Sequence, residues 1–223
     1  MTEWLKRNDF SYKQPKGQPA KANLEEQKKF VEVYRTLQKE VVDEPILFID
    51  SVHPTMASKI SRGWIAKKAD KFFPTTASRT RMNIAGAIEL SKMKIITRDY
   101  ETINAQSIIS FLTDVRASYK EVAKIHIILD QSGYHKSHDL SKYAKNNGIE
   151  LHFLPPYSPN LNPIERLWKV MNEEARNNYY FKSAKEFRER INKFFKEKIP
   201  IIAHTLSSRI NDNFRLVTPA KSF

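Results

Sequence analysis

The chain has 223 residues, of which 40% are hydrophobic, and its 38 Lys and Arg outnumber its 25 Asp and Glu to give a formal net charge of +13. This composition excludes a wholly disordered or low-complexity chain, and the absence of Cys excludes disulfides, thiolate metal sites and Cys nucleophiles. The basic excess favours nucleic acid as a partner, and because the longest apolar runs are far too short to span a bilayer, we expect a soluble intracellular protein with no membrane partner.

The chain begins with elements that predict an arm, a helix and a strand. Residues 1–23 are rich in Lys, and their SYKQPKGQPAKAN stretch has almost nothing apolar to bury, so we expect a basic arm on the surface. Apolar residues at helical spacing predict an amphipathic helix over 24–38. The run ILFID at 46–50 is short and rich in β-branched and aromatic residues, which suits a buried strand that ends at Asp50.

The next stretch combines predicted strands with a concentration of basic residues. The segments GWIAK, MNIAGAIEL and MKIITRD, at 63–67, 82–90 and 93–99, predict an antiparallel meander of three strands. Between positions 58 and 98 there are ten Lys and Arg against two acidic residues, and Trp and Phe residues lie among them. This pattern suits phosphate contacts, although a solvated charged face is the alternative. The candidate DNA contacts here are Lys59, Arg62, Lys67, Lys68, Arg79 and Arg81.

The second half of the chain alternates helices and strands. Asn104 is a candidate N-cap for a helix that reaches about Tyr119, and Asn147 and Gly148 are a stop signal for a second helix. Pro200 and Pro219 are expected to break any helix in the last 25 residues. The remaining predictions are strands over 124–130 and 149–155, the second helix over about 138–146, and helices over 163–177 and 184–198.

Three acidic residues are candidates for chemistry. Asp50 and Asp130 each follow a predicted strand, and ligands of open α/β sheets bind at the carboxyl ends of strands. A turn-forming role is the alternative for each of these aspartates. Glu165 begins a helix behind Asn162 and Pro163, where it can complete a capping box or direct a carboxylate at the strand ends.

Three segments resemble the catalytic motifs of DDE transposases, in the bacterial insertion-sequence branch of the mariner-like superfamily. They are FIDSVHP at 48–54, ILDQSGYHKS at 128–137 and PPYSPNLNPIERLW at 155–168. The resemblance implies an α/β fold, a ribonuclease-H-like mixed five-stranded sheet flanked by helices. It implies a catalytic domain over 24–199, residues 1–23 as the remnant of a winged-helix DNA-binding module and its linker, and a C-terminal tail over 200–223.

The resemblance also implies an enzyme, a polynucleotidyl transferase and endonuclease. Asp50, Asp130 and Glu165 match the catalytic triad and would hold two Mg²⁺ or Mn²⁺ ions, because hard cations prefer oxygen ligands. Without metal, these clustered acids should raise the pKa of at least one of them. The implied reaction is cleavage at the ends of the element, followed by attack of the freed 3′-hydroxyl on target DNA.

Partners and location follow from the same resemblance. The expected partners are double-stranded DNA, namely terminal repeats and target, and a second copy of the chain in a synaptic complex in the bacterial cytoplasm near the nucleoid. Further candidate DNA contacts are His135, Lys136, Arg166 and Lys169. His135 can touch a phosphate or orient the loop after Asp130, and a zinc pair with His138 is the less favoured interpretation.

Two other functions stay open at this point. The chain could be an inactive or truncated DNA-binding remnant of a transposase, which would keep the fold and the charge but not the activity. A ribonuclease that acts on RNA–DNA hybrids would use the same fold and the same metals. A comparison of hybrid and duplex DNA as substrates distinguishes the ribonuclease from the transposase.

Overall fold

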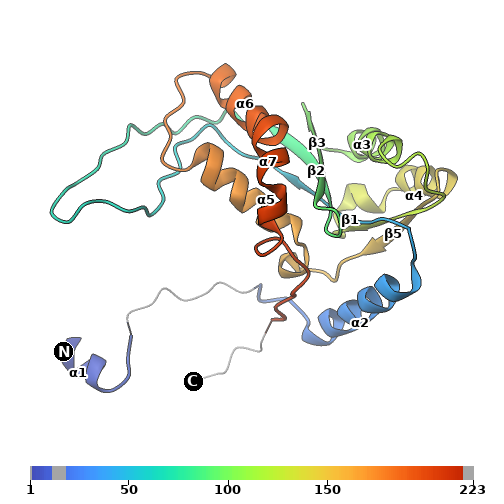
Figure 1. Ribbon diagram of the computed structural model, residues 1–223, viewed down its shortest axis with the longest axis horizontal. Coiled ribbons are helices and arrows are strands. Elements are labelled where there is room, and N and C mark those ends of the chain that lie inside the picture. Colours follow the sequence, from blue (N-terminus) through green and yellow to red (C-terminus); the bar gives the residue numbers. More distant parts are fainter. Residues whose placement is uncertain (1, 12–18, 218–223) are drawn as a thin grey trace.

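A mixed five-stranded sheet forms the centre of the protein, in a computed structural model that describes residues 2–11 and 19–217 (Figure 1). The spatial order of the strands is β3-β2-β1-β4-β5. β1 pairs antiparallel with β2 and parallel with β4, so the mixed sheet expected from the sequence is present. The strands are β1 (Ile46–Val52), β2 (Asn83–Glu89), β3 (Lys94–Tyr100), β4 (Ile125–Leu129) and β5 (Ile149–Phe153).

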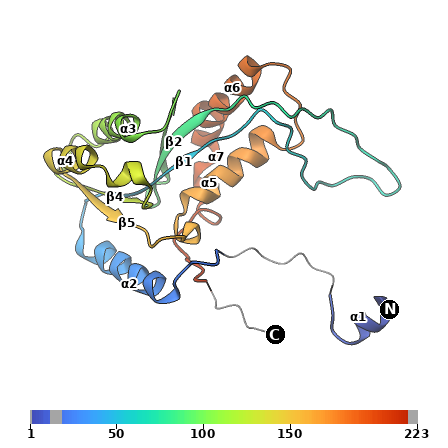
Figure 2. The ribbon, with the colours of Figure 1, turned by 180° about the vertical axis from the view of Figure 1, so that it is seen from behind.

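Helices cover both faces of the sheet (Figures 1 and 2). One face packs against α3 (Ala105–Ala117) and α4 (His138–Asn146), and its core includes Phe111 and Ile127. The other face carries a second core that includes Phe48 and Trp168. The helices around that second core are α2 (Leu24–Glu40), α5 (Ile164–Met171), α6 (Ala184–Lys193) and α7 (Ile199–Leu206), and a six-residue α1 (Thr2–Arg7) lies near the N-terminus.

Several local signals in the sequence produce the structure that they predict. The side chain of Asn104 accepts a hydrogen bond from the backbone N–H of Ser107, and the Ser107 hydroxyl completes the capping box at the start of α3. Gly148, after the end of α4, has φ of +65°, and a Cβ there would lie 2.5 Å from the carbonyl oxygen of Ala123. Only glycine fits this turn, which sends the chain directly into β5.

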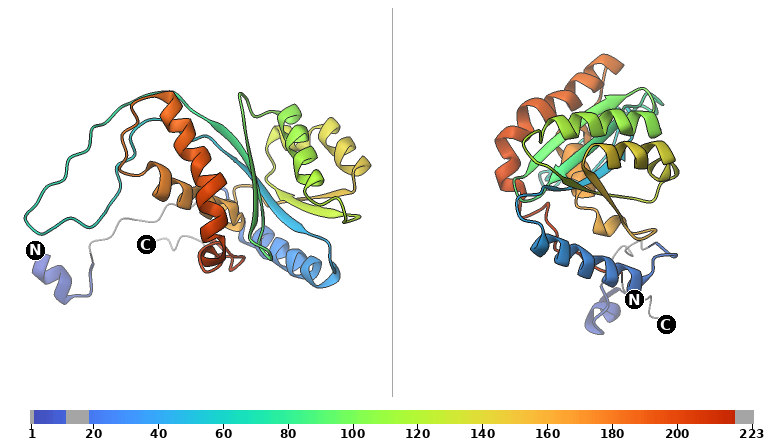
Figure 3. Two further views of the ribbon diagram at one scale, coloured as in Figure 1. Left: turned by 45° about the horizontal axis from the view of Figure 1, so that its top comes forward. Right: turned by 90° about the vertical axis from the view of Figure 1, so that its right-hand side faces the viewer.

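The predicted strand over 63–67 is wrong. Residues 56–81 instead form an irregular excursion between β1 and β2, which Figure 3 shows reaching away from the body of the protein. Its two limbs are joined near the base, where Met56 and Ser58 donate backbone hydrogen bonds to Thr80 and Thr76. Farther out, the side chain of Trp64 is fully exposed. β-propensity alone does not make a strand without a neighbouring strand to pair with, and β1 takes the place of this segment in the antiparallel meander.

The predicted effect of Pro200 is also wrong, because Pro200 lies in the first turn of α7. Proline is tolerated there because a π-helical turn (Phe194–Lys198) joins α6 to α7, and its wider hydrogen-bond spacing interrupts the regular i to i−4 pattern just before Pro200. Beyond α7, the side chains of Ile210 and Phe214 pack on the core that contains Phe48. Pro219 lies outside the described residues. No helix in the described part of the chain is long and apolar enough to cross a membrane.

Candidate active site

Three carboxylates from three different elements border one cleft of about 660 Å³ at the carboxyl ends of β1 and β4. Asp50 lies within β1, Asp130 directly follows β4, and Glu165 lies in the first turn of α5. The structure therefore brings together the three acidic residues that the sequence separates by up to 115 positions. The cleft is also bordered by Gln131, Ser132, Lys136, Asn162 and the residues from Leu154 to Pro159.

Asp50 is held by a contact that depends on α5. The indole Nε1 of Trp168 donates a hydrogen bond to Asp50 Oδ2 at 2.9 Å. Gly86 on β2 is the register partner of Asp50, and a Cβ on Gly86 would lie 2.4 Å from the Trp168 ring. The absence of a side chain at Gly86 therefore gives the indole its place beside Asp50. Burial, reinforced by Glu165 and Asp130, raises the pKa of Asp50 to about 7 in spite of this hydrogen bond.

Asp130 is held by residues that follow it directly in the chain. The backbone N–H and the hydroxyl of Ser132 donate to its two carboxylate oxygens at 3.0 and 2.7 Å. His135 Nδ1 lies 2.6 Å from Asp130 Oδ1, and its ring is 1% exposed. Although burial opposes ionisation, these hydrogen bonds lower the pKa of Asp130 to about 2. The loop-orienting interpretation of His135 agrees with this geometry, whereas its burial leaves no surface for a phosphate contact.

Glu165 is directed at the cleft by the turn that begins α5. Asn162 Oδ1 accepts a hydrogen bond from the backbone N–H of Ile164 at 3.4 Å, and its amide donates to the carbonyl oxygen of Ile49 at 3.3 Å. Asn162 thus joins the start of α5 to the residue before Asp50. Burial raises the pKa of Glu165 above its ordinary value, opposed by the Lys169 ammonium and reinforced by Asp130. The described contacts do not include the return bond of a capping box from Glu165.

The cleft fits a hard divalent cation. Its charged donors are carboxylates, and the raised pKa values of Asp50 and Glu165 show that negative charge is unfavourable there without a counter-ion. A divalent cation would remove this penalty and favour ionisation of both groups. In the described parts of the chain, the one three-residue group of metal-ligand types within 4.8 Å lies elsewhere, so the three carboxylates line the cleft without converging on a single point.

Most of the candidate DNA contacts are exposed, and Arg166 is instead engaged in contacts within the protein. Lys136 and Lys169 are exposed beside the carboxylates, and Arg166 binds the carbonyl oxygens of Asn211 and Asn213, so it fixes the C-terminal segment. The six candidates on the excursion, Lys59, Arg62, Lys67, Lys68, Arg79 and Arg81, are all exposed.

Sequence reasoning missed three residues that build the site. Trp168 is the last residue of the PPYSPNLNPIERLW segment and is buried in the core, yet its N–H also reaches Asp50. Gly86 and Asn162 depend on contacts between elements distant in the sequence, and no local signal marks Gly86. Asp130 itself is the one local signal available, because an aspartate side chain commonly accepts a hydrogen bond from the backbone N–H two residues later.

Comparisons with known proteins agree with this architecture. A family model described as a DDE superfamily endonuclease matches residues 45–188, and one described as a winged helix-turn helix matches residues 1–34. The "Insertion element IS630 uncharacterized 39 kDa protein" of Shigella sonnei is 23% identical over 173 residues, which make up 77% of this chain and 50% of that protein. The chain spans about half the length of the curated relatives it matches.

Solved structures show the same arrangement of elements. The crystal structure of the Mos1 strand transfer complex matches with a TM-score of 0.69 at 17% identity, over 93% of this chain and 66% of that chain. The crystal structure of the Mos1 mariner paired end complex with Mn matches with a TM-score of 0.68 at 14% identity, over 96% of this chain and 71% of that chain. This likeness shows the fold, which is the ribonuclease-H-like fold expected from the sequence.

Proposed function

The chain belongs to the DDE superfamily endonucleases, in the branch of the IS630 and mariner proteins, and from this premise we propose that it is a transposase that cleaves DNA with the help of divalent metal ions. In this proposal it cuts at the ends of a mobile element and joins the freed 3′-hydroxyl to target DNA. The observation that carries the proposal is the position of Asp50, Asp130 and Glu165, which come from three elements and border one cleft.

The three carboxylates would hold Mg²⁺ or Mn²⁺, two ions in the complete site. When bound, such ions polarise the scissile phosphate and activate the attacking water or 3′-hydroxyl. Asp130 is ready to bind them at neutral pH, because His135 and Ser132 keep it ionised. A cation beside Asp50 would favour the ionised form of this carboxyl group, and the Trp168 Nε1–H donates to its Oδ2.

The exposed cations of the excursion over residues 56–81 would bind the DNA backbone. This assignment rests on their exposure and on the absence of acidic partners for them among the ion pairs of the described residues. Lys136 and Lys169 would contact phosphates next to the reacting one. Affinity for duplex DNA should fall steeply with salt, with a slope of log K against log salt near −0.9 for each phosphate neutralised. A slope close to zero in a fluorescence-anisotropy titration would contradict the assignment.

The sequence predicts a catalytic domain over 24–199, residues 1–23 as part of a DNA-recognition module and 200–223 as a tail. We propose that the catalytic domain instead extends to residue 217, because Leu206, Ile210 and Phe214 pack on its second core. The match of residues 1–34 to a winged helix-turn helix model supports a role in DNA binding for residues 1–23. We further propose that two copies of the chain hold two element ends together. The matched Mos1 structure is a paired end complex, which supports this proposal.

The decisive experiment measures nicking of supercoiled plasmid and strand transfer of element-end duplexes in Mg²⁺ or Mn²⁺. The wild-type chain is compared with Glu165→Gln and with the control Glu173→Gln, which alters a surface ion pair to Arg209. We expect activity in the wild type and the control, and background in Glu165→Gln. Added Mg²⁺ or Mn²⁺ should also raise the Tm of the wild type, because a ligand that binds only the folded state stabilises it.

The possible outcomes separate the competing functions. Cleavage of RNA–DNA hybrids in preference to duplex DNA would favour the ribonuclease. If no protein cuts but all bind DNA with a steep salt slope and no metal-induced rise in Tm, the chain is a DNA-binding remnant. Equal activity in the wild type and Glu165→Gln would remove Glu165 from the site.

A further inference from the structure

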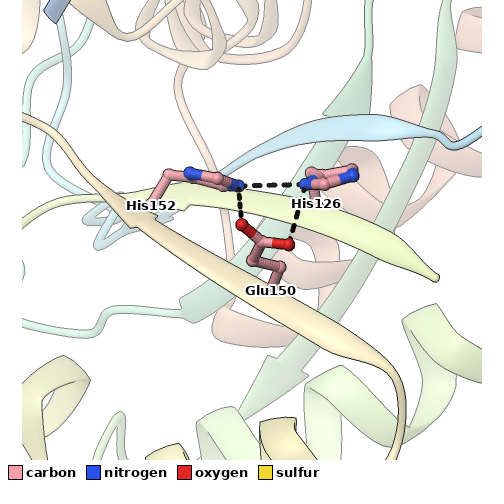
Figure 4. A group of neighbouring side chains, drawn as sticks. All are labelled: His126, Glu150 and His152. Atoms are coloured by element: carbon pink, nitrogen blue, oxygen red, sulfur yellow. Dashed lines mark hydrogen bonds and ion pairs between the residues drawn. The ribbon is translucent and has the colours of Figure 1, made fainter. Parts of the chain in front are cut away.

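A second group of possible metal ligands lies away from the carboxylate cleft, on β4 and β5 (Figure 4). His126 Nδ1 lies 3.0 Å from His152 Nε2 and 3.8 Å from a Glu150 carboxylate oxygen, and the other Glu150 oxygen lies 3.7 Å from His152 Nε2. The ring of His126 is 2% exposed, His152 is partly buried and Glu150 is half-exposed. The three side chains form a small polar cluster with one open side.

The strand register accounts for this cluster. His126 on β4 is the pairing partner of Glu150 on β5, and Glu150 and His152 are two residues apart, so they share one face of their strand. His126 is four residues before Asp130, so the cluster lies roughly 13 Å along the strand from the carboxylate cleft. The two groups occupy opposite ends of β4.

The hydrogen bonds of His126 decide which of its ring nitrogens carries the hydrogen atom. Its Nε2 lies 2.6 Å from Glu44 Oε2, and since a carboxylate accepts, Nε2 carries the hydrogen. Its Nδ1 is then the acceptor of the hydrogen bond with His152 Nε2, and a bound ion would replace that hydrogen bond between the two nitrogens. This arrangement is the one found around bound metals, where a ligating histidine donates its other N–H to a carboxylate that fixes the ring.

The distances also fit a tetrahedral ion. Two ligand atoms about 2.0–2.1 Å from such an ion lie roughly 3.3 Å apart. The two histidine nitrogens are separated by 3.0 Å, and each lies 3.7 or 3.8 Å from a different oxygen of the Glu150 carboxylate. One ligand atom from each of the three residues can be chosen so that all lie within 4.8 Å of one another. Imidazole nitrogens favour Zn²⁺ over Mg²⁺, which takes oxygen ligands. A competing contact is the ion pair of Lys124 with Glu150 at 3.4 Å, but both side chains are about half-exposed, and such pairs contribute little.

We propose that His126, Glu150 and His152 bind one Zn²⁺ ion, with Glu44 orienting His126 and a water molecule in the fourth position. Glu44 directly precedes the segment that leads into β1, so the site connects β1, β4 and β5 at the ends opposite to Asp50 and Asp130. The ion would hold β4 to β5 directly, and the hydrogen bond from His126 to Glu44 would connect it to the segment before β1. This structural role is independent of the proposed function of the carboxylate cleft.

The experiment uses the full chain without a histidine tag, stripped of metal with a chelator. Bound zinc is measured by equilibrium dialysis and elemental analysis with excess Mg²⁺ present, and Co²⁺ substitution reports tetrahedral geometry by its visible absorption. His152→Asn and the half-exposed Glu150→Gln test the ligands, so that one variant remains if the other fails to fold. His138→Asn, whose ring is 89% exposed, and Asp50→Asn are the controls.

We expect one zinc per chain in the wild type and both controls, a rise in Tm on adding zinc, and loss of both effects in His152→Asn and Glu150→Gln. Glu44→Gln should weaken zinc binding by about 10–100-fold. The proposal is overturned if the wild type binds no stoichiometric zinc or if both ligand variants bind it as tightly as the wild type. Loss of zinc in Asp50→Asn would overturn it as well, since the metal would then belong to the carboxylate cleft.

Discussion

The two aspartates of the cleft occupy similar positions on neighbouring parallel strands, yet their pKa values shift in opposite directions. Asp130 receives hydrogen bonds from residues within five positions of it, and its pKa falls to about 2. Asp50 receives one from Trp168, 118 positions away, and faces Glu165, so its pKa rises to about 7. The comparison teaches that hydrogen-bond donors close in the sequence stabilise an ionised carboxylate, whereas burial between elements distant in the sequence raises the pKa of a carboxyl group.

Asp50→Asn should give the largest effect. It removes the carboxyl group whose pKa rises from 3.8 to about 7, so the metal-free variant at pH 8 should be more stable than the wild type by up to about 4 kcal/mol. The folded wild type binds the Asp50 proton more tightly than the unfolded chain does. The contribution of Asp50 to the free energy of unfolding therefore falls between about pH 4 and pH 7, and it stays low above pH 7. Urea unfolding with EDTA at pH 4 and pH 8 measures both proteins. Parallel pH profiles for the two would contradict the raised pKa.

His135→Ala should have the next largest effect, on the other side of the cleft. Loss of a hydrogen bond to a charged group typically costs about 1.5–3 kcal/mol. The lowered pKa of Asp130 contributes stability that is present above about pH 4 and is lost as the pH falls toward 2, so the variant should lose less stability on acidification. Acid titration followed by carboxyl ¹³C NMR reports the pKa directly. The matched control is His138→Ala. An unchanged pKa of Asp130 in His135→Ala would show that His135 does not lower that pKa.

Gly86→Ala should have a smaller effect and act on Asp50 through Trp168. The added Cβ would lie 2.4 Å from the indole ring, and overpacking of this kind costs about 1–3 kcal/mol. The companion variant Trp168→Phe keeps an aromatic ring but removes the N–H donor. Loss of this hydrogen bond should lower the free energy of unfolding by about 1 kcal/mol. Both should raise the pKa of Asp50 further, because that hydrogen bond favours the ionised form. If Gly86→Ala leaves both the stability and the pKa of Asp50 unchanged, the indole does not depend on the space at Gly86.

The sequence predicted the regular elements well where the signals were local. The Asn104 cap, the Gly148 turn and the apolar runs of β1, β4 and β5 each depend on residues close together in the chain, and each appears as expected. The errors came from segments whose structure depends on neighbours. The strand predicted over 63–67 has no partner, and Pro200 joins a helix because a π-helical turn precedes it.

By itself the sequence determined the elements, the basic charge and the family, and it identified the three acidic residues through motifs that are contiguous in the chain. Only the tertiary structure decided that these residues border one cleft, that Trp168 reaches Asp50 over Gly86, and that His126 meets Glu150 and His152. The physical reason is that propensity, caps and turns act over a few residues, whereas electrostatic environment and side-chain contacts are set by the strand order and by helices that pack across it.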